Sequence, residues 1–206
     1  MQEGFFERYF EPEKEDIENT VLLGRMNPPG QHHVDIIEHA EDKYGPDNCY
    51  IFLCETSQRT GSNPMTADER VEALEYSFED TGLEDRLDLN TVDVDVFGNF
   101  WDDISSTVSG PSAYHTGDLY QALLAEVAKR GTDDISVDYE PRDQRQFLEE
   151  GPDSGSEIRE LMSEGEEWRP YVATGTEYIV AENPEILEAV NTGSTGSIIR
   201  DVELVI

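Results

Sequence analysis

Positive charge is scarce in this chain of 206 residues. Lysine and arginine together number 14, against 47 aspartates and glutamates, and the formal net charge is -33. Lysine occurs only as Lys14, Lys43 and Lys129, so arginine carries most of the positive charge. A chain with so few cations can bind a polyphosphate only by concentrating them at the binding site, and the position of each arginine is therefore informative.

Cysteine and long apolar runs are also nearly absent. Cys49 and Cys54 are five residues apart in one predicted strand and lie on its opposite faces, so they cannot form a disulfide with each other without breaking the strand. We expect reduced cysteines in a cytoplasmic protein. No apolar run approaches the roughly 20 residues of a membrane span, and residues 1–10 lack a signal-peptide pattern, so we expect no membrane partner.

The acidity has three interpretations. A disordered chain fits poorly, because apolar residues recur in periodic runs such as CYIFLCE (49–55). A nucleic-acid mimic would leave the motifs described below unexplained. A protein of a salt-saturated cytoplasm fits best, because concentrated salt shortens the Debye length to about 3 Å or less and screens the repulsion between carboxylates. We predict a halophilic protein with no nucleic acid partner, whose activity rises with KCl.

Short strands and helices alternate along the chain. The pattern predicts strands at 20–24, 49–55, 87–96, 112–116 and 135–139, and helices over 32–43, from Thr66 onward, and over 99–108, 118–131 and 155–164. Thr66 and Glu69 form a capping box at the start of the second helix. This alternation with short links predicts an α/β fold, a doubly wound parallel sheet with helices on both faces.

Two segments are the strongest candidates for binding chemistry. VLLGRMNPPGQHHVDII (Val21–Ile37) is typical of a buried strand, a tight turn and a helix start, and SGSEIR (Ser154–Arg159) begins another helix. The first N–H groups of a helix are unpaired and its dipole is positive there, so helix starts bind phosphate. Since ligands of doubly wound sheets bind at the carboxyl ends of the strands, we expect a nucleotide between the two segments.

The same segments carry a family resemblance. GRMNPPGQHH (24–33) resembles the GRFxPFHxGH motif of the nicotinamide-nucleotide adenylyltransferases, which belong to the nucleotidyltransferases marked by (H/T)xGH. SGSEIRELMSEGEEW (154–168) resembles the second motif of that family in its archaeal form. Between them, NPMTADERVEAL (63–74) resembles the NPFTAGERI stretch, FGNFWDD (97–103) the segment that supplies a tryptophan, and HTGD (115–118) the SGN element. The matches follow the family order.

The resemblance implies three parts of the chain. Residues 19–172 correspond to the nucleotidyltransferase domain, 1–18 form an acidic N-terminal extension, and 173–206 form a C-terminal extension that packs on the domain. In the extension we expect helix, then a Gly/Ser/Thr turn at 192–197 and a final strand at 198–206.

The resemblance also implies an activity, the transfer of AMP from ATP to nicotinamide mononucleotide to give NAD and pyrophosphate, without a covalent intermediate. Mg²⁺ is expected with ATP, the partners are small-molecule substrates, and a homo-oligomer is expected. The residues implied as catalytic are His33, Arg159 and Arg25. Those implied in ATP binding are Met26, Asn27, Gly30, His32, His33, Ser154, Ser156, Ile158 and Arg159, and those implied in acceptor binding are Trp101, Gly117 and Asp118.

One position departs from the family motif. Gly30 stands where the family has histidine or threonine, and His32 stands where the family has glycine. Loss of one fixed hydrogen-bond donor to a charged transition state lowers the rate about 10²- to 10³-fold. Three outcomes are open: His32 supplies the missing contact, the enzyme is slow, or the chain binds nucleotide without transferring it. A transferase with a cytidylyl, flavin or pantetheine type of acceptor is a further alternative.

Several side chains have structural alternatives to a role in binding. For Arg25 and Arg159 the alternative is an ion pair with a surface carboxylate, and for Trp101 it is core packing. Asp118 contacts the acceptor or caps a helix. The remaining expectations are a solvated His39, a His115 that is either buried or next to the site, and a Trp168 used for packing.

Overall fold

The computed structural model describes residues 17–45, 48–55, 59–79, 81–83, 85–92, 100–117, 119–128, 134–140, 151–152 and 154–194. At positions 100, 101, 120, 128 and 194 it describes the backbone alone. The predicted final strand (198–206) and nearly all of the N-terminal extension lie outside these residues, as does Asp118.

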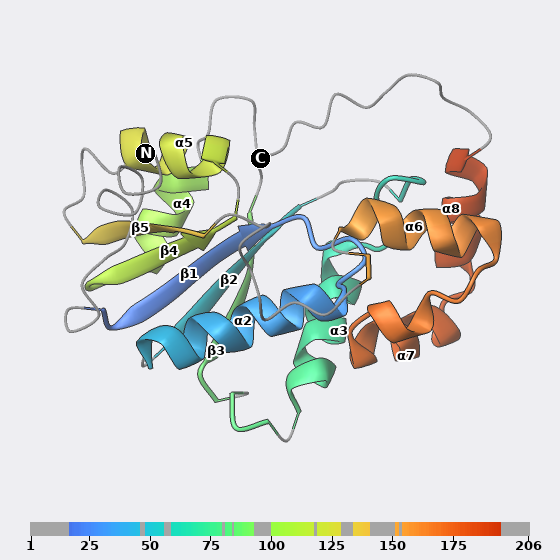
Figure 1. The fold of residues 1–206 in the computed structure, drawn as a ribbon, viewed down its shortest axis with the longest axis horizontal. Coiled ribbons are helices and arrows are strands. Elements are labelled where there is room, and N and C mark those ends of the chain that lie inside the picture. Colours follow the sequence, from blue (N-terminus) through green and yellow to red (C-terminus); the bar gives the residue numbers. More distant parts are fainter. Residues whose placement is uncertain are drawn as a thin grey trace, which may run out of the picture.

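Five parallel strands form one sheet in the order β3-β2-β1-β4-β5 (Figure 1). The strands are β1 (Asn19–Gly24), β2 (Asn48–Cys54), β3 (Leu87–Val92), β4 (Ser112–Thr116) and β5 (Ile135–Tyr139). In the register, Val21 of the central strand lies opposite Tyr50 of β2 and Tyr114 of β4. The parallel order confirms the predicted α/β class, because parallel neighbours require crossover connections, which here contain helices.

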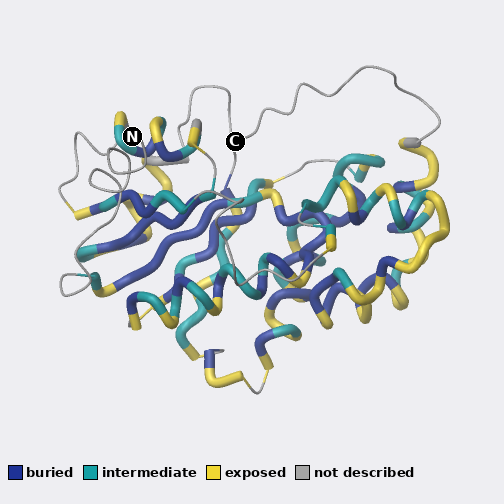
Figure 2. The backbone as a smooth tube through the Cα atoms, in the orientation of Figure 1, coloured by how far each residue is buried: buried dark blue, intermediate teal, exposed yellow. Residues whose placement is uncertain are grey.

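Helices cover both faces of the sheet (Figure 1). The helices that connect the strands are α2 (Gln31–Tyr44), α3 (Ala67–Phe78), α4 (Phe100–Thr107) and α5 (Leu119–Ala128). One core cluster joins Leu22 of β1 to residues of α2 and α3, and a second joins Val21 to residues of α4 and α5. Because neighbouring residues of β1 point to opposite faces, the sheet is buried on both sides, and Figure 2 shows its central strands as largely buried.

Local signals set the helix ends close to where the sequence predicts them. The Thr66 hydroxyl accepts a hydrogen bond from the Glu69 N–H (3.3 Å), and the Glu69 carboxylate accepts one from the Thr66 N–H (2.8 Å). Gly45 ends α2, and Gly165 ends the later helix α6 (Gly155–Glu164), both in the left-handed region, with φ of 58° and 70°. A side chain there would be strained, so glycine is the residue that ends these helices at least cost.

A second group of helices lies beyond the carboxyl ends of the strands (Figure 1). It contains α6 (Gly155–Glu164), the 3-10 helix η4 (Arg169–Tyr171), α7 (Thr174–Glu182) and α8 (Glu185–Ser194). Trp168 is 6% exposed in the apolar cluster shared by these helices and α3, which confirms its packing role. Gly175 lies directly against the Ala73 carbonyl, so α7 packs closely on α3.

The end of α8 corrects one prediction. The helix continues through Ser194, whereas a turn is predicted from residue 192. Gly193 lies against the backbone of Gly61, and two glycines without side chains permit this close contact. None of the helices in the described ranges is both long and apolar enough to cross a membrane.

Candidate functional site

The strand order places a topological switch point between the adjacent strands β1 and β4. The crossover from β1 leads through α2 to β2 on one side, while β4 lies on the other side of β1. The connections that follow β1 and β4 therefore leave in opposite directions, and doubly wound sheets bind ligands in the crevice outside the carboxyl ends of two such strands. The turn after β1 (25–30) and Gly117 after β4 flank this point.

The turn after β1 is held by buried polar side chains. Asn27 is 2% exposed and pairs with the backbone of Met65, donating to its carbonyl (2.8 Å) and accepting from its N–H (3.0 Å). Met26 has a left-handed backbone (φ 41°) and packs its side chain in the core. The side chains of these two predicted ATP-binding residues therefore hold the turn in place. Contact of their backbone with ATP stays a prediction.

Arg70 fixes the same turn from α3. This arginine is 0% exposed and donates three hydrogen bonds to backbone carbonyls, those of Arg25 (2.5 Å), Cys54 (2.9 Å) and Thr66 (3.2 Å). It thereby links the carboxyl ends of β1 and β2 to the first turn of α3. This role of Arg70 was not predicted from the sequence. The signal for it is that Arg70 lies on the same helix stripe as Leu74 and Phe78, and a charged residue on a buried stripe indicates a fixed partner.

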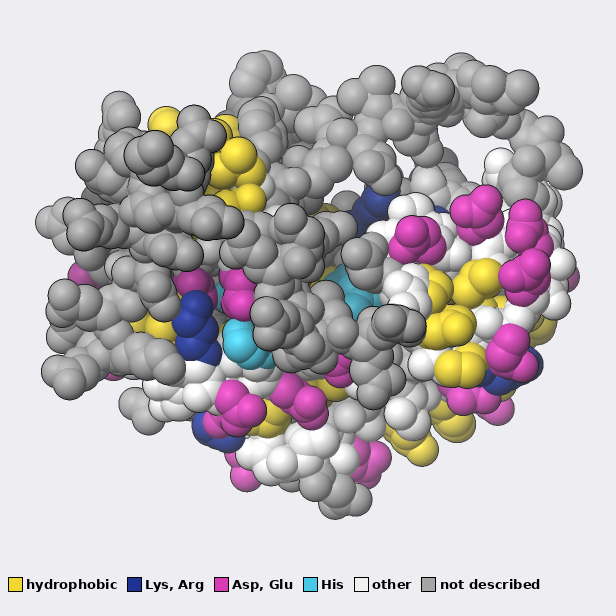
Figure 3. All heavy atoms as spheres, in the orientation of Figure 1, with side chains coloured by type: hydrophobic (Ala, Val, Ile, Leu, Met, Phe, Trp, Pro, Cys, Tyr) yellow, Lys and Arg dark blue, Asp and Glu magenta, His cyan; other side chains and the backbone are white. Residues whose placement is uncertain are grey.

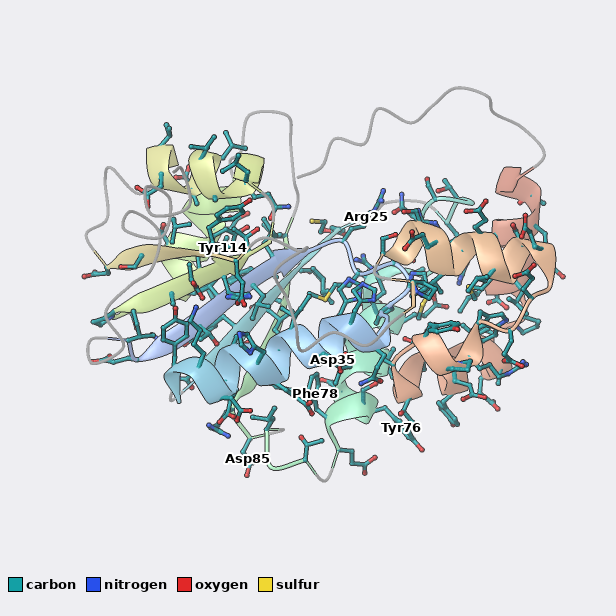
Figure 4. All side chains as sticks on the ribbon, in the orientation of Figure 1. Arg25, Asp35, Tyr76, Phe78, Asp85 and Tyr114 are labelled. Atoms are coloured by element: carbon teal, nitrogen blue, oxygen red, sulfur yellow. The ribbon has the colours of Figure 1, made fainter. Side chains whose placement is uncertain are left out.

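The Arg25 side chain is exposed at the end of β1, close to α6 (Figure 4). It forms no ion pair with the described residues, whereas other described cations do so: Lys43, Arg59, Arg86 and Arg169. Carboxylates are scattered over the described part of the face in Figure 3, so an arginine without one is unusual in this chain. Its guanidinium is therefore available for an anionic ligand.

The hydrogen bonds at the start of α2 define the protonation of His33. The Gly30 N–H donates to His33 Nδ1 (2.8 Å), and the His33 N–H donates to the Gly30 carbonyl (3.0 Å). Since Nδ1 accepts a hydrogen bond, the neutral ring carries its proton on Nε2. His33 therefore has an N–H donor at the electropositive end of the helix. The His32 ring lies beside it, with a centroid distance of 3.9 Å, and His32 is 8% exposed.

The start of α6 meets the same turn. Arg159 Nη1 donates to the Asn27 carbonyl (2.5 Å), although the two residues are 132 positions apart in the sequence. A Cβ on Gly155 would come within 3.1 Å of that carbonyl, so glycine permits the close approach. The structure thus brings Arg159 beside the turn that carries Arg25 and His33, and two helix starts lie at one edge of the sheet.

The other predicted residues of α6 occupy different environments. Ser154 caps the helix, accepting from the Glu157 N–H (3.3 Å), and its hydroxyl is 3.1 Å from that of Ser156. Both serines are partly exposed. Ile158 is 0% exposed in the apolar cluster, so its side chain packs against the neighbouring helices.

The acceptor side is described in part. Gly117 directly follows β4 and is partly exposed at the switch point. Trp101 lies in α4, but its side chain is outside the described atoms, and Asp118 is outside the described residues. The predicted acceptor contacts of these three residues stay predictions.

A buried polar cluster that the sequence analysis missed lies between α2, β4 and β5. Asp138 is 1% exposed and accepts hydrogen bonds from Lys43 (2.8 and 3.0 Å) and from His115 Nδ1 (2.7 Å). Burial alone would raise the pKa of Asp138, but His115 and Lys43 lower it to about 2. His115 is thus a buried, hydrogen-bonded histidine.

His39 lies beside this cluster and corrects a prediction. It is partly buried and pairs with Glu140 (3.1 Å), and its ring centroid is 6.0 Å from that of His115. The prediction of a solvated His39 was wrong, because α2 lies across β4 and β5 and carries this residue towards them. The acidic neighbours of His39 in the sequence gave no indication of that contact.

No protein-family model matches the chain, and no curated protein matches its sequence. Solved structures are similar in fold. The bifunctional NMN adenylyltransferase/ADP ribose pyrophosphatase of Francisella tularensis, solved with AMP and a manganese ion, has a TM-score of 0.66 and 13% identity over 87% of this chain and 53% of its own. This chain therefore spans about half the length of the Francisella protein.

This chain matches two further structures over almost their whole length. A Vibrio parahaemolyticus protein assigned as a nicotinate-nucleotide adenylyltransferase has a TM-score of 0.58 and 13% identity over 84% of this chain and 98% of its own. The Plasmodium falciparum nicotinic acid mononucleotide adenylyltransferase, complexed with APC, has a TM-score of 0.54 and 9% identity over 82% and 96%. At these identities the likeness establishes the fold, and the chain has the Rossmann-like α/β fold of these nucleotidyltransferases.

Proposed function

We propose that this chain is an adenylyltransferase that transfers AMP from ATP to nicotinamide mononucleotide and forms NAD and pyrophosphate. The proposal depends on one observation: Arg159 of α6 donates to the carbonyl of Asn27, in the turn before α2, so the starts of the two helices lie together, with Arg25 exposed beside them. Helix starts and arginines bind phosphate groups, and a switch point can hold two nucleotides side by side. The fold shared with adenylyltransferases supports the same reaction.

The reaction requires positioning and charge stabilisation rather than a titrating base. The phosphate of the acceptor attacks the α-phosphorus of ATP in line, the bond to the bridging oxygen breaks, and pyrophosphate leaves with its electrons. His33 donates from Nε2 to the α- or β-phosphate, and Arg25 contacts phosphate from the first turn. Arg159 and Ser156 hold the β- and γ-phosphates from α6. Each group stabilises charge that develops on phosphate oxygens.

Mg²⁺ enters this site with ATP. The side chains here are guanidinium, imidazole and hydroxyl groups, which suit phosphate oxygens better than they suit a bare cation. Mg²⁺ commonly keeps several waters and binds through substrate phosphates, so this donor set fits Mg·ATP as the substrate. On the acceptor side, Trp101 stacks on the nicotinamide ring, a contact of about 0.5–2 kcal/mol, and Gly117 and Asp118 contact the nucleotide.

Two alternatives remain for the same site. A different acceptor, of the cytidylyl, flavin or pantetheine type, would keep the fold and the ATP contacts. A protein that binds nucleotide without transferring it is the second alternative, because Gly30 lacks the side chain that the family motif has at this position. The proposal also includes a halophilic, cytoplasmic protein that self-associates, and sedimentation in concentrated KCl tests the last point.

The test measures NAD and pyrophosphate formed from ATP, nicotinamide mononucleotide and Mg²⁺ in about 2 M KCl. His33→Ala and Arg159→Ala should each lower kcat/KM by about 10²-fold or more. His39→Ala on the same helix and Arg169→Ala on η4 are matched controls, since both residues lie outside the proposed site, and they should change kcat/KM less than threefold or so.

Different outcomes identify different errors. Turnover with other acceptors alone would replace nicotinamide mononucleotide in the proposal. Binding of ATP without pyrophosphate release would establish the binding-only alternative. Turnover that His33→Ala and Arg159→Ala leave unchanged would refute the assigned residues.

A further inference from the structure

The absence of a side chain at position 30 needs a physical reason. Gly30 precedes α2 with φ -99° and ψ 165°, an extended conformation that any residue adopts. Serine, threonine, aspartate and asparagine are preferred over alanine at this capping position because their side chains bind the first N–H groups of the helix. Glycine is also accepted at this capping position, about as well as threonine, so neither backbone conformation nor capping requires it.

The space beside Gly30 supplies the reason. A Cβ at position 30 would lie 2.5 Å from His32 Cε1, 2.6 Å from His32 Nδ1 and 2.8 Å from Ile158 Cδ1. These separations are far below a carbon–carbon contact distance of about 3.5 Å. The His32 ring thus occupies the volume in which a side chain at position 30 would stand, and Gly30 and His32 are sterically coupled.

This position places the His32 ring between the two helix starts of the site. The ring contacts the His33 ring on α2, and Ile158 of α6 borders the same space. We infer that His32 supplies, from the second residue of α2, the phosphate-binding donor that position 30 lacks. The inference rests on the proposed function, and it gives His32, which the resemblance implies only as one of the ATP-binding residues, the specific role of the phosphate donor in place of position 30.

A cycle of four variants tests the inference in about 2 M KCl. The two readouts are the dissociation constant of Mg·ATP, from calorimetry, and kcat for NAD formation. His32→Ala should lower kcat by about 10²-fold, and Gly30→Ala should lower it too, because the new methyl displaces the ring. Gly30→Ala should have no further effect in the His32→Ala background, where the space is empty.

Transposition of the histidine is the decisive variant. Gly30→His combined with His32→Ala returns an imidazole to the same volume from the neighbouring position and should regain at least about tenfold of the lost rate. Gly30→His alone should remain impaired, because two rings compete for one space. His39→Ala is the matched control, and thermal unfolding of each variant separates loss of fold from loss of contact.

The outcomes separate the inference from the proposed function. If the native chain forms NAD and His32→Ala keeps both its rate and its affinity for Mg·ATP, the inference is refuted and the function stands. If the native chain binds Mg·ATP without transfer, the proposed reaction fails, and a weaker affinity of His32→Ala that the transposed variant restores still supports the inference. If the native chain does not bind Mg·ATP, both are refuted.

Discussion

Arg70 is a fully buried arginine whose guanidinium binds backbone instead of carboxylates. Its three acceptors come from the end of β1, the end of β2 and the start of α3. Burial lowers the pKa of Arg70, which reflects the cost of keeping a charge away from water. That cost is tolerable because one planar group donates to three carbonyls at once.

Replacing Arg70 should therefore destabilise the chain strongly. Arg70→Met removes the guanidinium donor of the Arg25 and Cys54 carbonyls and one of the two donors of the Thr66 carbonyl, which also accepts from the Arg70 backbone N–H, and we expect a loss on the order of 3 kcal/mol in the free energy of unfolding. Arg70→Lys keeps the charge but cannot reach all three carbonyls, so its loss should be smaller. Urea unfolding measures both.

Arg169→Met is the matched control for this prediction, because Arg169 is exposed, pairs with surface carboxylates and lies over the Trp168 ring, 4.9 Å from its centroid. It should change the free energy of unfolding by no more than about 1 kcal/mol. If Arg70→Met were as mild as this control, Arg70 would not hold the strand ends together.

Among the elements, α3 depends on its capping box. Thr66 and Glu69 exchange hydrogen bonds, and Arg59 binds Glu69 as well (2.7 Å). Thr66→Ala removes the acceptor of the Glu69 N–H and should cost about 1 kcal/mol in thermal or urea unfolding. Ser106→Ala, at an exposed hydroxyl within α4, should cost clearly less. Equal losses in both variants would show that the cap contributes nothing.

The Asp138 cluster connects α2 to β4 and β5 and makes the contact between these elements sensitive to acid. The pKa of Asp138 is about 2 in the folded chain, below its ordinary value of 3.8. A carboxylate with a depressed pKa stabilises the fold above the unfolded pKa and loses this contribution as pH falls through the folded pKa. The window of loss therefore runs from about pH 3.8 down to about pH 2.

Asp138→Asn should remove this pH dependence. We expect the variant to be less stable than the native chain by about 2 kcal/mol at pH 7, and we expect the difference to shrink as pH falls towards 2. Urea unfolding at pH 7, 4, 3 and 2 measures it. Asp85→Asn is the control, because Asp85 is exposed at the edge of the molecule (Figure 4). A difference between Asp138→Asn and the native chain that stays constant with pH would contradict the assignment.

At the scale of the whole molecule, the net charge of -33 dominates the electrostatics. Acidic residues outnumber basic ones by 47 to 14, so most carboxylates have no partner of opposite charge. Their mutual repulsion opposes the compact state at low ionic strength. It also repels ATP, which is itself an anion.

Salt should therefore raise both stability and activity. Between 0.1 M and 1 M KCl the Debye length falls from about 10 Å to about 3 Å, and we expect Tm to rise and the KM for ATP to fall. Differential scanning calorimetry and the NAD assay measure the two effects. KCl is used because sulfate would also strengthen apolar burial. A Tm that falls as KCl rises would refute the halophilic interpretation.

Part of the candidate site can be predicted from sequence because helix starts are local features. The positions of Ser154, Thr66 and the turn before α2 follow from capping residues and from the alternation of strands and helices. Partners such as Asn27 and Met65, or Asn27 and Arg159, cannot be predicted in this way. Each pair is distant in the sequence and meets only when the sheet forms.

The sequence by itself determined the α/β class, the starts of α3 and α6 and the two segments that bind phosphate in the proposal, because periodicity and capping act over a few residues. Only the tertiary structure decided the strand order, since the same alternation fits other doubly wound orders. It also decided that His32 fills the space beside Gly30. Packing of distant elements sets such contacts, and no local pattern encodes them.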